Sequence, residues 1–290
     1  MEQIRKSAFL CPHCRQPLTY DRHQYICTSH HSYDRAKSGY VNFLPPSAPG
    51  AGHGDDRLMV RARRDFLERG YYRKLADAVC GVLQEYCGDL TSPLLLDAGC
   101  GEGYYTALAA EALQKPDIAA NPKILAVDIS RSAAELCARR LPDAEVAVAS
   151  VYDLPMAQNS CDVMINIFSP LADTEYARVL KSGGVFLTVI PLEEHLFSLK
   201  AAVYDTPYRN QVKDTALPGF AFLERRDVRY PITLTSLSDI KNLFAMTPYY
   251  YKTSARDQAK LDALTTLTTE AAFGILVYRK CDTVSVPEKQ

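Results

Sequence analysis

The sequence of 290 residues predicts an α/β protein: a large domain built on a mostly parallel sheet, preceded by a small cysteine-rich module. Two observations predict this architecture. From about residue 71 onward, short apolar runs alternate with helical patterns, as in parallel strands that are connected by crossover helices. Three of the nine cysteines and four of the six histidines lie within residues 11–34, which indicates a distinct module at this end.

Composition excludes several classes of protein. The chain is 47% hydrophobic and 23% charged, so it can bury a full core. No apolar run approaches the roughly 20 residues that span a bilayer, and the first residues are too polar for a secretory signal. We therefore expect a cytoplasmic protein without a membrane partner. The six cysteines outside the first module lie in or beside apolar stretches, where we expect small buried hydrophobes rather than disulfides.

The cysteine-rich module has the ligand spacing of a zinc site. Cys11 and Cys14 form a C-x2-C pair, and Cys27 follows after twelve residues. These three thiolates need a fourth ligand, for which the spacing offers His30 or His31. The sequence LTYDRHQYIC predicts two short strands joined at residues 21–23, as in a zinc ribbon. Because so short a segment cannot build a core, we expect a structural zinc rather than a catalytic zinc or an iron–sulfur cluster.

Positive charge is concentrated in the N-terminal quarter. Residues 1–75 carry 13 Lys and Arg against 7 Asp and Glu, whereas the other 215 residues carry 20 against 27. The densest part, RLMVRARRDFLERGYYRK, predicts a basic helix, although a solvated helix face has the same composition. A basic segment beside a metal module favours a phosphate-bearing partner. The candidate contacts with such a partner are Arg61, Arg63 and Arg64.

The chain divides into three predicted segments: a zinc-binding ribbon (1–45), a Pro- and Gly-rich linker with the basic helix (46–70), and the large domain (71–290). In the large domain a helix over 72–87 should stop at Gly88. The predicted strands that follow are 93–98, 124–129, 144–149, 161–168, 184–190 and 271–280. The predicted helices between them are 104–113, 132–141, 172–180 and 237–246.

A ligand site is expected beyond the carboxyl ends of the first strands of this sheet. Asp97 is followed by Gly99, Gly101 and Gly103, whose spacing lets backbone N–H groups approach a ligand closely. The spacing is neither that of a dinucleotide fingerprint nor that of a phosphate-binding P-loop. Asp128 ends the next strand, where its carboxylate can accept hydrogen bonds from both hydroxyls of a ribose.

Together, LLLDAGCGEGYY and AVDIS resemble the class I S-adenosylmethionine-dependent methyltransferases, which have a Rossmann-like, mostly parallel sheet. The resemblance extends the expected cofactor contacts to Glu102 and Ile129. It also aligns Ser150, with Val151 after it, at a position where this superfamily often has an acidic residue that meets adenine. Asp153 is a nearby carboxylate that could meet adenine instead. Groups close to the transferred methyl would come from INIFSP, with Asn166 and Ser169 as candidates.

A narrower resemblance rests on an ordered set of motifs: the ribbon, AKSGYVNFLP, RARRDFLERGYY, DAGCGEGYY, IFSP, RVLKSGG, HLFSLKAAVYD and MTP. In this order they resemble the bacterial 23S rRNA (guanine-N1)-methyltransferases of the RlmA family, from Cys11 to about Pro248. The resemblance implies that His31 is the fourth zinc ligand. It also implies S-adenosylmethionine contacts at Tyr72, His195 and the loop from Gly101 to Tyr104. A further implication is a homodimer whose zinc modules bind an rRNA hairpin near the peptide exit tunnel.

The chemistry implied by the resemblance is methyl transfer to N1 of a guanine, which requires that the N1 proton leave. Asn166, Asp153 and His195 are the candidate catalytic residues. Two other functions remain open: a small-molecule methyltransferase with a structural ribbon, and a zinc-dependent RNA-binding factor with an inactive methyltransferase fold. Replacing His31 by alanine should cost zinc and rRNA methylation while S-adenosylmethionine binding is largely kept.

Overall fold

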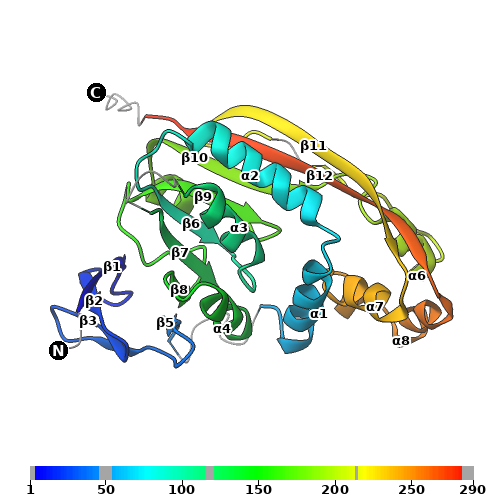
Figure 1. The fold of residues 1–290 in the computed structure, drawn as a ribbon, viewed down its shortest axis with the longest axis horizontal. Coiled ribbons are helices and arrows are strands. Elements are labelled where there is room, and N and C mark those ends of the chain that lie inside the picture. The colour runs from blue at the N-terminus through cyan, green and yellow to red at the C-terminus, as the bar shows by residue number, and fades with distance from the viewer. Residues whose placement is uncertain (1–3, 46–53, 115–120, 213–214, 283–290) are drawn as a thin grey trace, which may run out of the picture.

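The described part of the chain contains two β-sheets. The computed structural model describes residues 4–45, 54–114, 121–212 and 215–282. An antiparallel sheet of four strands lies at the N-terminal end, and an eight-stranded sheet forms the centre of the molecule (Figure 1). The small sheet has the order β1 (Arg5–Leu10), β2 (Pro17–Tyr20), β3 (Gln24–Cys27) and β4 (Ser32–Asp34).

The turn between β2 and β3 lies at residues 21–23, so the predicted hairpin is confirmed. The Asp21 carboxylate accepts hydrogen bonds from the backbone N–H groups of His23 and Gln24 at 2.7 and 2.9 Å. An aspartate that bonds the backbone two and three residues ahead is a common way to close a tight turn. This turn therefore follows directly from the local sequence.

The eight-stranded sheet has the order β11-β12-β10-β9-β6-β7-β8-β5. All neighbours from β10 to β5 are parallel, whereas β12 runs antiparallel to both β10 and β11. This mostly parallel sheet confirms the predicted fold class. Its strands are β5 (Val41–Asn42), β6 (Leu94–Ala98), β7 (Lys123–Asp128), β8 (Glu145–Val148), β9 (Cys161–Ile167), β10 (Leu180–Pro191), β11 (Phe220–Leu234) and β12 (Leu267–Lys280).

The helices form where the sequence repeats apolar residues at helical spacing. In α2 this pattern ends at Cys87, with Gly88 as the C-terminal cap, as predicted. The helices are α1 (Arg57–Glu68), α2 (Arg73–Cys87), α3 (Tyr104–Ala112), α4 (Arg131–Arg140), α5 (Asp173–Val179), α6 (Phe197–Val203), α7 (Leu237–Ala245) and α8 (Ala255–Gln258), with short 3-10 helices at η1 (Tyr250–Lys252) and η2 (Ala259–Ala263). Within the described residues, no helix is long and apolar enough to cross a membrane.

The large sheet is buried on both faces, so it has two hydrophobic cores. Adjacent residues of one strand show this division, because Leu95 belongs to one core and Leu96 to the other, and both are fully buried. The first core contains residues of α1, α2, α3, α4, α6 and α7. The second contains residues of α5 together with Phe9, Leu18 and Tyr25 of the small sheet. The N-terminal sheet therefore packs directly on one face of the central sheet.

Three features of the fold were not predicted. The long strand β11 was missed, because it is an edge strand in which charged residues interrupt the apolar pattern. β12 begins at Leu267, before the apolar stretch that indicated it. β5 pairs with β8 of the central sheet, although it lies within the segment assigned to the ribbon. Much of the predicted linker, residues 46–53, lies outside the described residues.

Candidate functional site: a metal cluster and two adjoining cavities

Four side chains of the N-terminal sheet form a compact set of metal-binding groups. Cys11 and Cys14 come from the turn after β1, Cys27 ends β3, and His31 precedes β4. Their ligand atoms all lie within 4.8 Å of one another. The Sγ atom of Cys27 lies 3.4 Å from Nδ1 of His31. Three thiolates and one imidazole at this separation fit a tetrahedral structural zinc, because no ligand position stays open.

The geometry also distinguishes between the two neighbouring histidines. His31 directs Nδ1 into the cluster, whereas His30 is exposed and has a left-handed backbone with φ of +61°. The backbone N–H of His30 donates to the carbonyl of Cys27 at 3.0 Å, which closes the turn. The Tyr33 hydroxyl lies 3.1 Å from Sγ of Cys11 and supports this ligand from outside the cluster.

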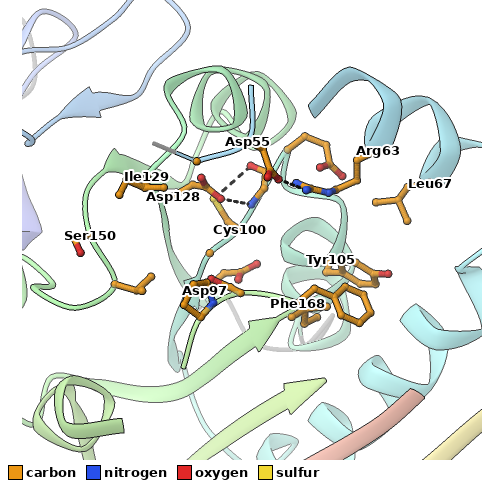
Figure 2. Close-up of a pocket in the computed structure, with 18 of the residues that line it drawn as sticks. Asp55, Arg63, Leu67, Asp97, Cys100, Tyr105, Asp128, Ile129, Ser150 and Phe168 are labelled. Atoms are coloured by element: carbon orange, nitrogen blue, oxygen red, sulfur yellow. Dashed lines mark hydrogen bonds and ion pairs between the residues drawn. The ribbon is translucent and has the colours of Figure 1, made fainter. Parts of the chain in front are cut away.

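A cavity of about 300 Å³ lies at the carboxyl ends of β6, β7, β8 and β9 (Figure 2). This is the edge of the sheet where the sequence predicted a ligand. The α1 helix contributes Arg63 and Leu67 from the opposite side. The residues predicted to hold the cofactor that line this cavity are Asp97, Gly99, Gly101, Glu102, Asp128, Ile129, Ser150 and Val151.

Two positions of the loop after β6 require glycine, each for a different structural reason. A Cβ at Gly99 would lie 2.0 Å from Oγ of Ser169, so only glycine lets these two cavity-lining loops approach. A Cβ at Gly103 would lie 2.9 Å from Sγ of Cys137 on α4, and Gly103 does not line the cavity. Both residues have positive φ, +97° and +82°, which favours glycine independently. Gly103 therefore serves helix packing.

A second cavity, of about 640 Å³, adjoins the first. The two share wall residues, among them Asp55, Arg63, Tyr105 and Phe168. The larger cavity continues toward α6 and β12, and its lining is mainly apolar and aromatic. The predicted cofactor contacts Tyr72 and His195 line this larger cavity and are absent from the lining of the smaller one.

Comparison with known proteins identifies both parts of the chain. Residues 9–48 match the family model of the RlmA N-terminal zinc ribbon, and residues 95–184 match a methyltransferase domain. A Micromonospora griseorubida protein, provisionally named a 23S rRNA (guanine-N(1)-)-methyltransferase, is 31% identical over 93% of this chain and 96% of its own length. This chain belongs to the RlmA methyltransferase family.

Two further relatives support this assignment to the family. The 23S rRNA (guanine(748)-N(1))-methyltransferase of Streptomyces fradiae is 32% identical over 67% of this chain, which spans 66% of that protein. YxjB of Bacillus subtilis, provisionally named a 23S rRNA (guanine-N(1)-)-methyltransferase, is 30% identical over 74% of this chain and 75% of its own length. The cofactors of this RlmA-family chain are S-adenosylmethionine and a structural zinc ion.

Asp97 shows that the smaller cavity fits the methionine end of S-adenosylmethionine. Its Oδ2 accepts a hydrogen bond from the Thr106 hydroxyl at 2.6 Å, whereas its buried Oδ1 has no partner within the described residues. Burial raises the pKa of the Asp97 carboxyl to about 7. A buried carboxylate oxygen without a partner is costly, and an ammonium group of a ligand would satisfy it.

Asp128 holds the glycine loop in place. Its two oxygens accept backbone N–H groups, Oδ1 from Ser130 at 2.7 Å and Oδ2 from Gly101 at 2.9 Å. Burial raises the pKa of Asp128 above its ordinary value. Each carboxylate oxygen keeps a second lone pair, so Asp128 can still accept a hydrogen bond from a ribose hydroxyl.

Arg63, an expected RNA contact, lies at the wall of the smaller cavity. Its guanidinium forms an ion pair with Asp55 and lies 3.4 Å from where a Cβ of Gly101 would be, above the glycine loop. Burial alone would lower the pKa of Arg63, but nearby carboxylates, Asp55 foremost, raise it above its ordinary value. Among the described residues, Arg63 is the one cation that lines the smaller cavity, which also has four carboxylates. The other two arginines, Arg61 and Arg64, are exposed or half-exposed and pair with Asp65.

His195 is held as a neutral hydrogen-bond donor at the wall of the larger cavity. Its Nδ1 accepts the backbone N–H of Ala272 at 3.2 Å. Burial, together with the nearby Lys200 ammonium, lowers the pKa of His195 to about 3. Because Nδ1 accepts, the neutral ring carries its hydrogen on Nε2. His195 is therefore poorly suited to accept a proton there and well suited to donate a hydrogen bond.

The side chains of the other two candidate catalytic residues, Asn166 and Asp153, are engaged in structural contacts. The Asn166 amide donates to the carbonyl of Ala98 and to the Tyr176 hydroxyl at 3.0 and 2.9 Å, and its oxygen accepts the Thr188 hydroxyl at 3.2 Å. Asn166 lines the larger cavity but mainly ties strand ends together. Asp153 lines neither cavity, because its 68% exposed side chain pairs with Arg15 of the ribbon.

Sequence reasoning missed Asp55 of the shared wall and misplaced Tyr104. Tyr104, an expected cofactor contact, lines neither cavity; its ring lies 5.9 Å from the Arg140 guanidinium. Tyr105, the next residue, lines both, and its buried hydroxyl has no partner within the described part of the chain. Asp55 also lines both. Its position within the predicted linker gave no signal, because the pairing with Arg63 needs the folded α1.

Proposed function

We propose that this chain transfers the methyl group of S-adenosylmethionine to N1 of a guanine in a 23S rRNA hairpin near the peptide exit tunnel. The observation that carries this proposal is the larger cavity, which shares a wall with the cofactor pocket in a chain that aligns over 93% of its length with a guanine-N1-methyltransferase relative. A cavity of about 640 Å³ accommodates a purine base. A base that is paired or stacked in RNA must leave its stack to enter such a site.

The residues of the shared wall suit an unstacked guanine. Phe168 has a left-handed backbone and a 46% exposed side chain, and its ring lies 6.4 Å from that of Tyr105. Exposed aromatic rings stack on bases. His195 lines the larger cavity, and its Nε2–H can donate to O6 as negative charge develops on the base.

The sulfonium of S-adenosylmethionine supplies an activated methyl group. The protein must hold guanine N1 in line with it and accept the N1 proton as the N–C bond forms and the S–C bond breaks. Within the described residues, Asp55 is the one carboxylate that lines the larger cavity. We assign the proton to Asp55, whose partner Arg63 also lines the smaller cavity and can pair there with the carboxylate of the methionine moiety.

The remaining functional expectations belong to the same proposal. Arg61 and Arg64 lie on α1, which lines both cavities through Arg63 and Leu67, and they would meet RNA phosphates beside the site. The ribbon would extend this contact along the hairpin. The resemblance to the family supports a homodimer that acts in the cytoplasm.

The test is methylation by the purified protein of 23S rRNA from cells that lack the gene, with S-adenosylmethionine that carries a deuterated methyl. We expect deuterated N1-methylguanine after nuclease digestion and mass spectrometry, and none with an Asp128→Ala control. Activity on a free metabolite without activity on rRNA would favour the small-molecule alternative. Failure to bind S-adenosylmethionine at saturating concentration would favour an inactive RNA-binding factor.

A further inference from the structure

The loop at residues 150–156 joins the cofactor pocket to the zinc ribbon. Its first three residues, Ser150, Val151 and Tyr152, line the smaller cavity. Each of its next four residues contacts the ribbon, as the following paragraphs describe. We call this segment the 150–156 loop. One short stretch of backbone therefore belongs to both sites.

The backbone of β1 holds the far end of the 150–156 loop. Phe9 forms an antiparallel bridge with Met156, and the backbone N–H of Leu10 donates to the carbonyl of Pro155 at 2.7 Å. Phe9 and Met156 are 0% and 1% exposed, so this contact is part of the core. Leu10 immediately precedes the first zinc ligand, Cys11, and the position of the loop is thereby tied to the zinc turn.

Arg15 connects the zinc turn to the middle of the 150–156 loop. It follows the second ligand, Cys14, and its backbone N–H donates to the Cys11 carbonyl at 2.8 Å. Its guanidinium donates to the carbonyl of Leu154 at 3.1 Å and forms an ion pair with Asp153. An exposed ion pair contributes little by itself, so the directional bond to the buried Leu154 is the more important contact.

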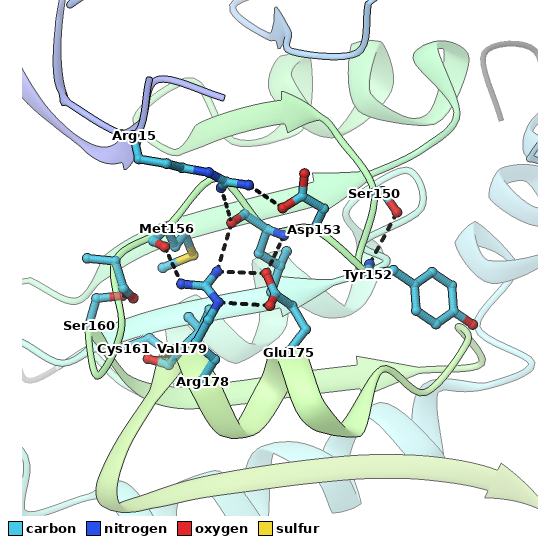
Figure 3. Close-up of polar contacts among 12 residues, drawn as sticks. Arg15, Ser150, Tyr152, Asp153, Met156, Ser160, Cys161, Glu175, Arg178 and Val179 are labelled. Atoms are coloured by element: carbon cyan, nitrogen blue, oxygen red, sulfur yellow. Dashed lines mark hydrogen bonds and ion pairs between the residues drawn. The ribbon is translucent and has the colours of Figure 1, made fainter. Parts of the chain in front are cut away.

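The α5 helix holds the same loop from its other side (Figure 3). Arg178 donates to the carbonyls of Leu154 and Met156 at 3.0 and 2.7 Å. The Glu175 carboxylate accepts the backbone N–H of Leu154 at 2.6 Å and pairs with Arg178. The Leu154 carbonyl is thus shared between Arg178 of the sheet domain and Arg15 of the ribbon. Without the zinc turn, only the α5 side of this arrangement remains.

We propose that Arg15 is a positioning residue for S-adenosylmethionine, and that zinc binding by the ribbon favours cofactor binding by fixing the 150–156 loop. Zinc folds the turn that carries Leu10 and Arg15, because a segment of this size depends on its metal for stability. The fixed turn holds residues 153–156, and these hold the three residues that line the cofactor pocket. Two ligands that each favour the same loop conformation must bind cooperatively.

This inference rests on the family's cofactor, not on the proposed rRNA substrate, and it replaces the expectation that loss of zinc would largely spare S-adenosylmethionine binding. Its test uses S-adenosylhomocysteine, the stable demethylated product of the cofactor, and calorimetry on the full chain. We expect the dissociation constant to rise about tenfold when a chelator removes zinc, which is within the usual range of coupling between sites.

The variant Arg15→Ala separates loop positioning from general unfolding of the ribbon. It removes no ligand atom, so it should keep one zinc per chain while weakening S-adenosylhomocysteine binding about threefold. Amide hydrogen exchange at residues 152–156 should become faster in this variant. Arg15→Lys should recover part of the affinity, because a lysine can still donate to the Leu154 carbonyl.

Arg22→Ala is the matched control, since Arg22 is an exposed arginine of the same ribbon and contacts His23 in the β2–β3 turn. It should bind S-adenosylhomocysteine as the wild type does. The proposal is overturned if Arg15→Ala, with zinc retained, matches Arg22→Ala in both affinity and exchange at residues 152–156. It is equally overturned if zinc-depleted, folded protein binds S-adenosylhomocysteine as tightly as the zinc-loaded form.

Discussion

Asp97 is a buried carboxyl whose charge state is set by what binds beside it. Burial raises its pKa to about 7, so near neutral pH it is partly protonated when the pocket holds no ligand. The ammonium group of S-adenosylmethionine favours the ionised form and should lower this pKa on binding. Cofactor binding therefore releases a proton from Asp97.

The prediction is that cofactor affinity rises with pH between about 6 and 8. Below the pKa of about 7, the ligand must first displace the proton of Asp97, so the dissociation constant should increase up to about tenfold per pH unit. Calorimetry with S-adenosylhomocysteine in buffers of different ionisation enthalpy measures both the affinity and the released proton. In Asp97→Asn the pH dependence should vanish; an unchanged slope in that variant would assign the proton to another group.

Arg63 supports a second prediction at the residue scale. As the one cation among the described residues lining the smaller cavity, it is the group that can pair with the methionine carboxylate. Arg63→Ala should weaken S-adenosylhomocysteine binding about tenfold or more, and Arg63→Lys less, because a lysine keeps the charge without the planar fork. Arg61→Ala is the control, since the Arg61 side chain is 79% exposed. Equal affinities of Arg63→Ala and Arg61→Ala would contradict the assignment.

Single residues show how far local patterns can place side chains at the cavity. Asp97, Gly101 and Asp128 were predictable, because a glycine loop after one strand and an acid at the end of the next are local patterns. Arg63 was misassigned, because composition shows charge but not the direction of a side chain on a helix. Asp55 was missed because its pairing with Arg63 depends on the folded α1 and its contact with Ser130 joins segments that are distant in sequence.

At the scale of elements, the zinc turn determines whether the ribbon folds. His31→Ala removes a ligand and should lower the zinc content and the melting temperature of the ribbon, whereas His30→Ala should keep one zinc per chain. The pair is matched, because the two histidines are adjacent and His30 points away from the cluster. Metal analysis after gel filtration, with thermal unfolding, measures both effects. Zinc loss in His30→Ala with zinc retained in His31→Ala would show that the ligand assignment is wrong.

The predictability of elements follows their apolar content. Strands β6, β7 and β9 are buried on both faces and read as continuous apolar runs, so they were predicted. β11 lies at the edge of the sheet and alternates exposed and half-buried residues, so it was not predicted. β5 has two residues, and it is defined only by its pairing with β8. The periodicity of apolar residues in a sequence does not report which distant segments pair.

At the scale of the whole molecule, the ribbon and the sheet domain form one packed unit. The second hydrophobic core combines Phe9, Tyr25 and Phe43 with Leu96 and Met164 of the central strands. The Glu145 carboxylate, buried at the edge of the sheet, accepts hydrogen bonds from the Ser7 hydroxyl and the Ala8 backbone. The sequence predicts the two modules separately but not this joint core, because no local pattern reports which faces meet.

The joint core packs the metal ribbon against the sheet that carries the methyl-donor pocket, so both belong to one body. Such a body can hold an RNA hairpin at the ribbon and at α1 while one base enters the cavity beside the cofactor. This arrangement is what the account requires of an rRNA guanine methyltransferase. A metabolite enzyme would need the cavity and Arg63 but would have no use for Arg61 and Arg64 on the outside of α1.

The most direct test is to map N1-methylguanine in 23S rRNA from wild-type cells, a deletion strain, and the deletion strain complemented with the intact gene or with Asp128→Ala. Primer extension reports the modification, because N1 methylation blocks base pairing, and mass mapping confirms it. The account predicts a stop at one guanine of the hairpin in wild-type and complemented cells, and its loss in the deletion and Asp128→Ala strains. Unchanged methylation at every guanine of that hairpin in the deletion strain would contradict it.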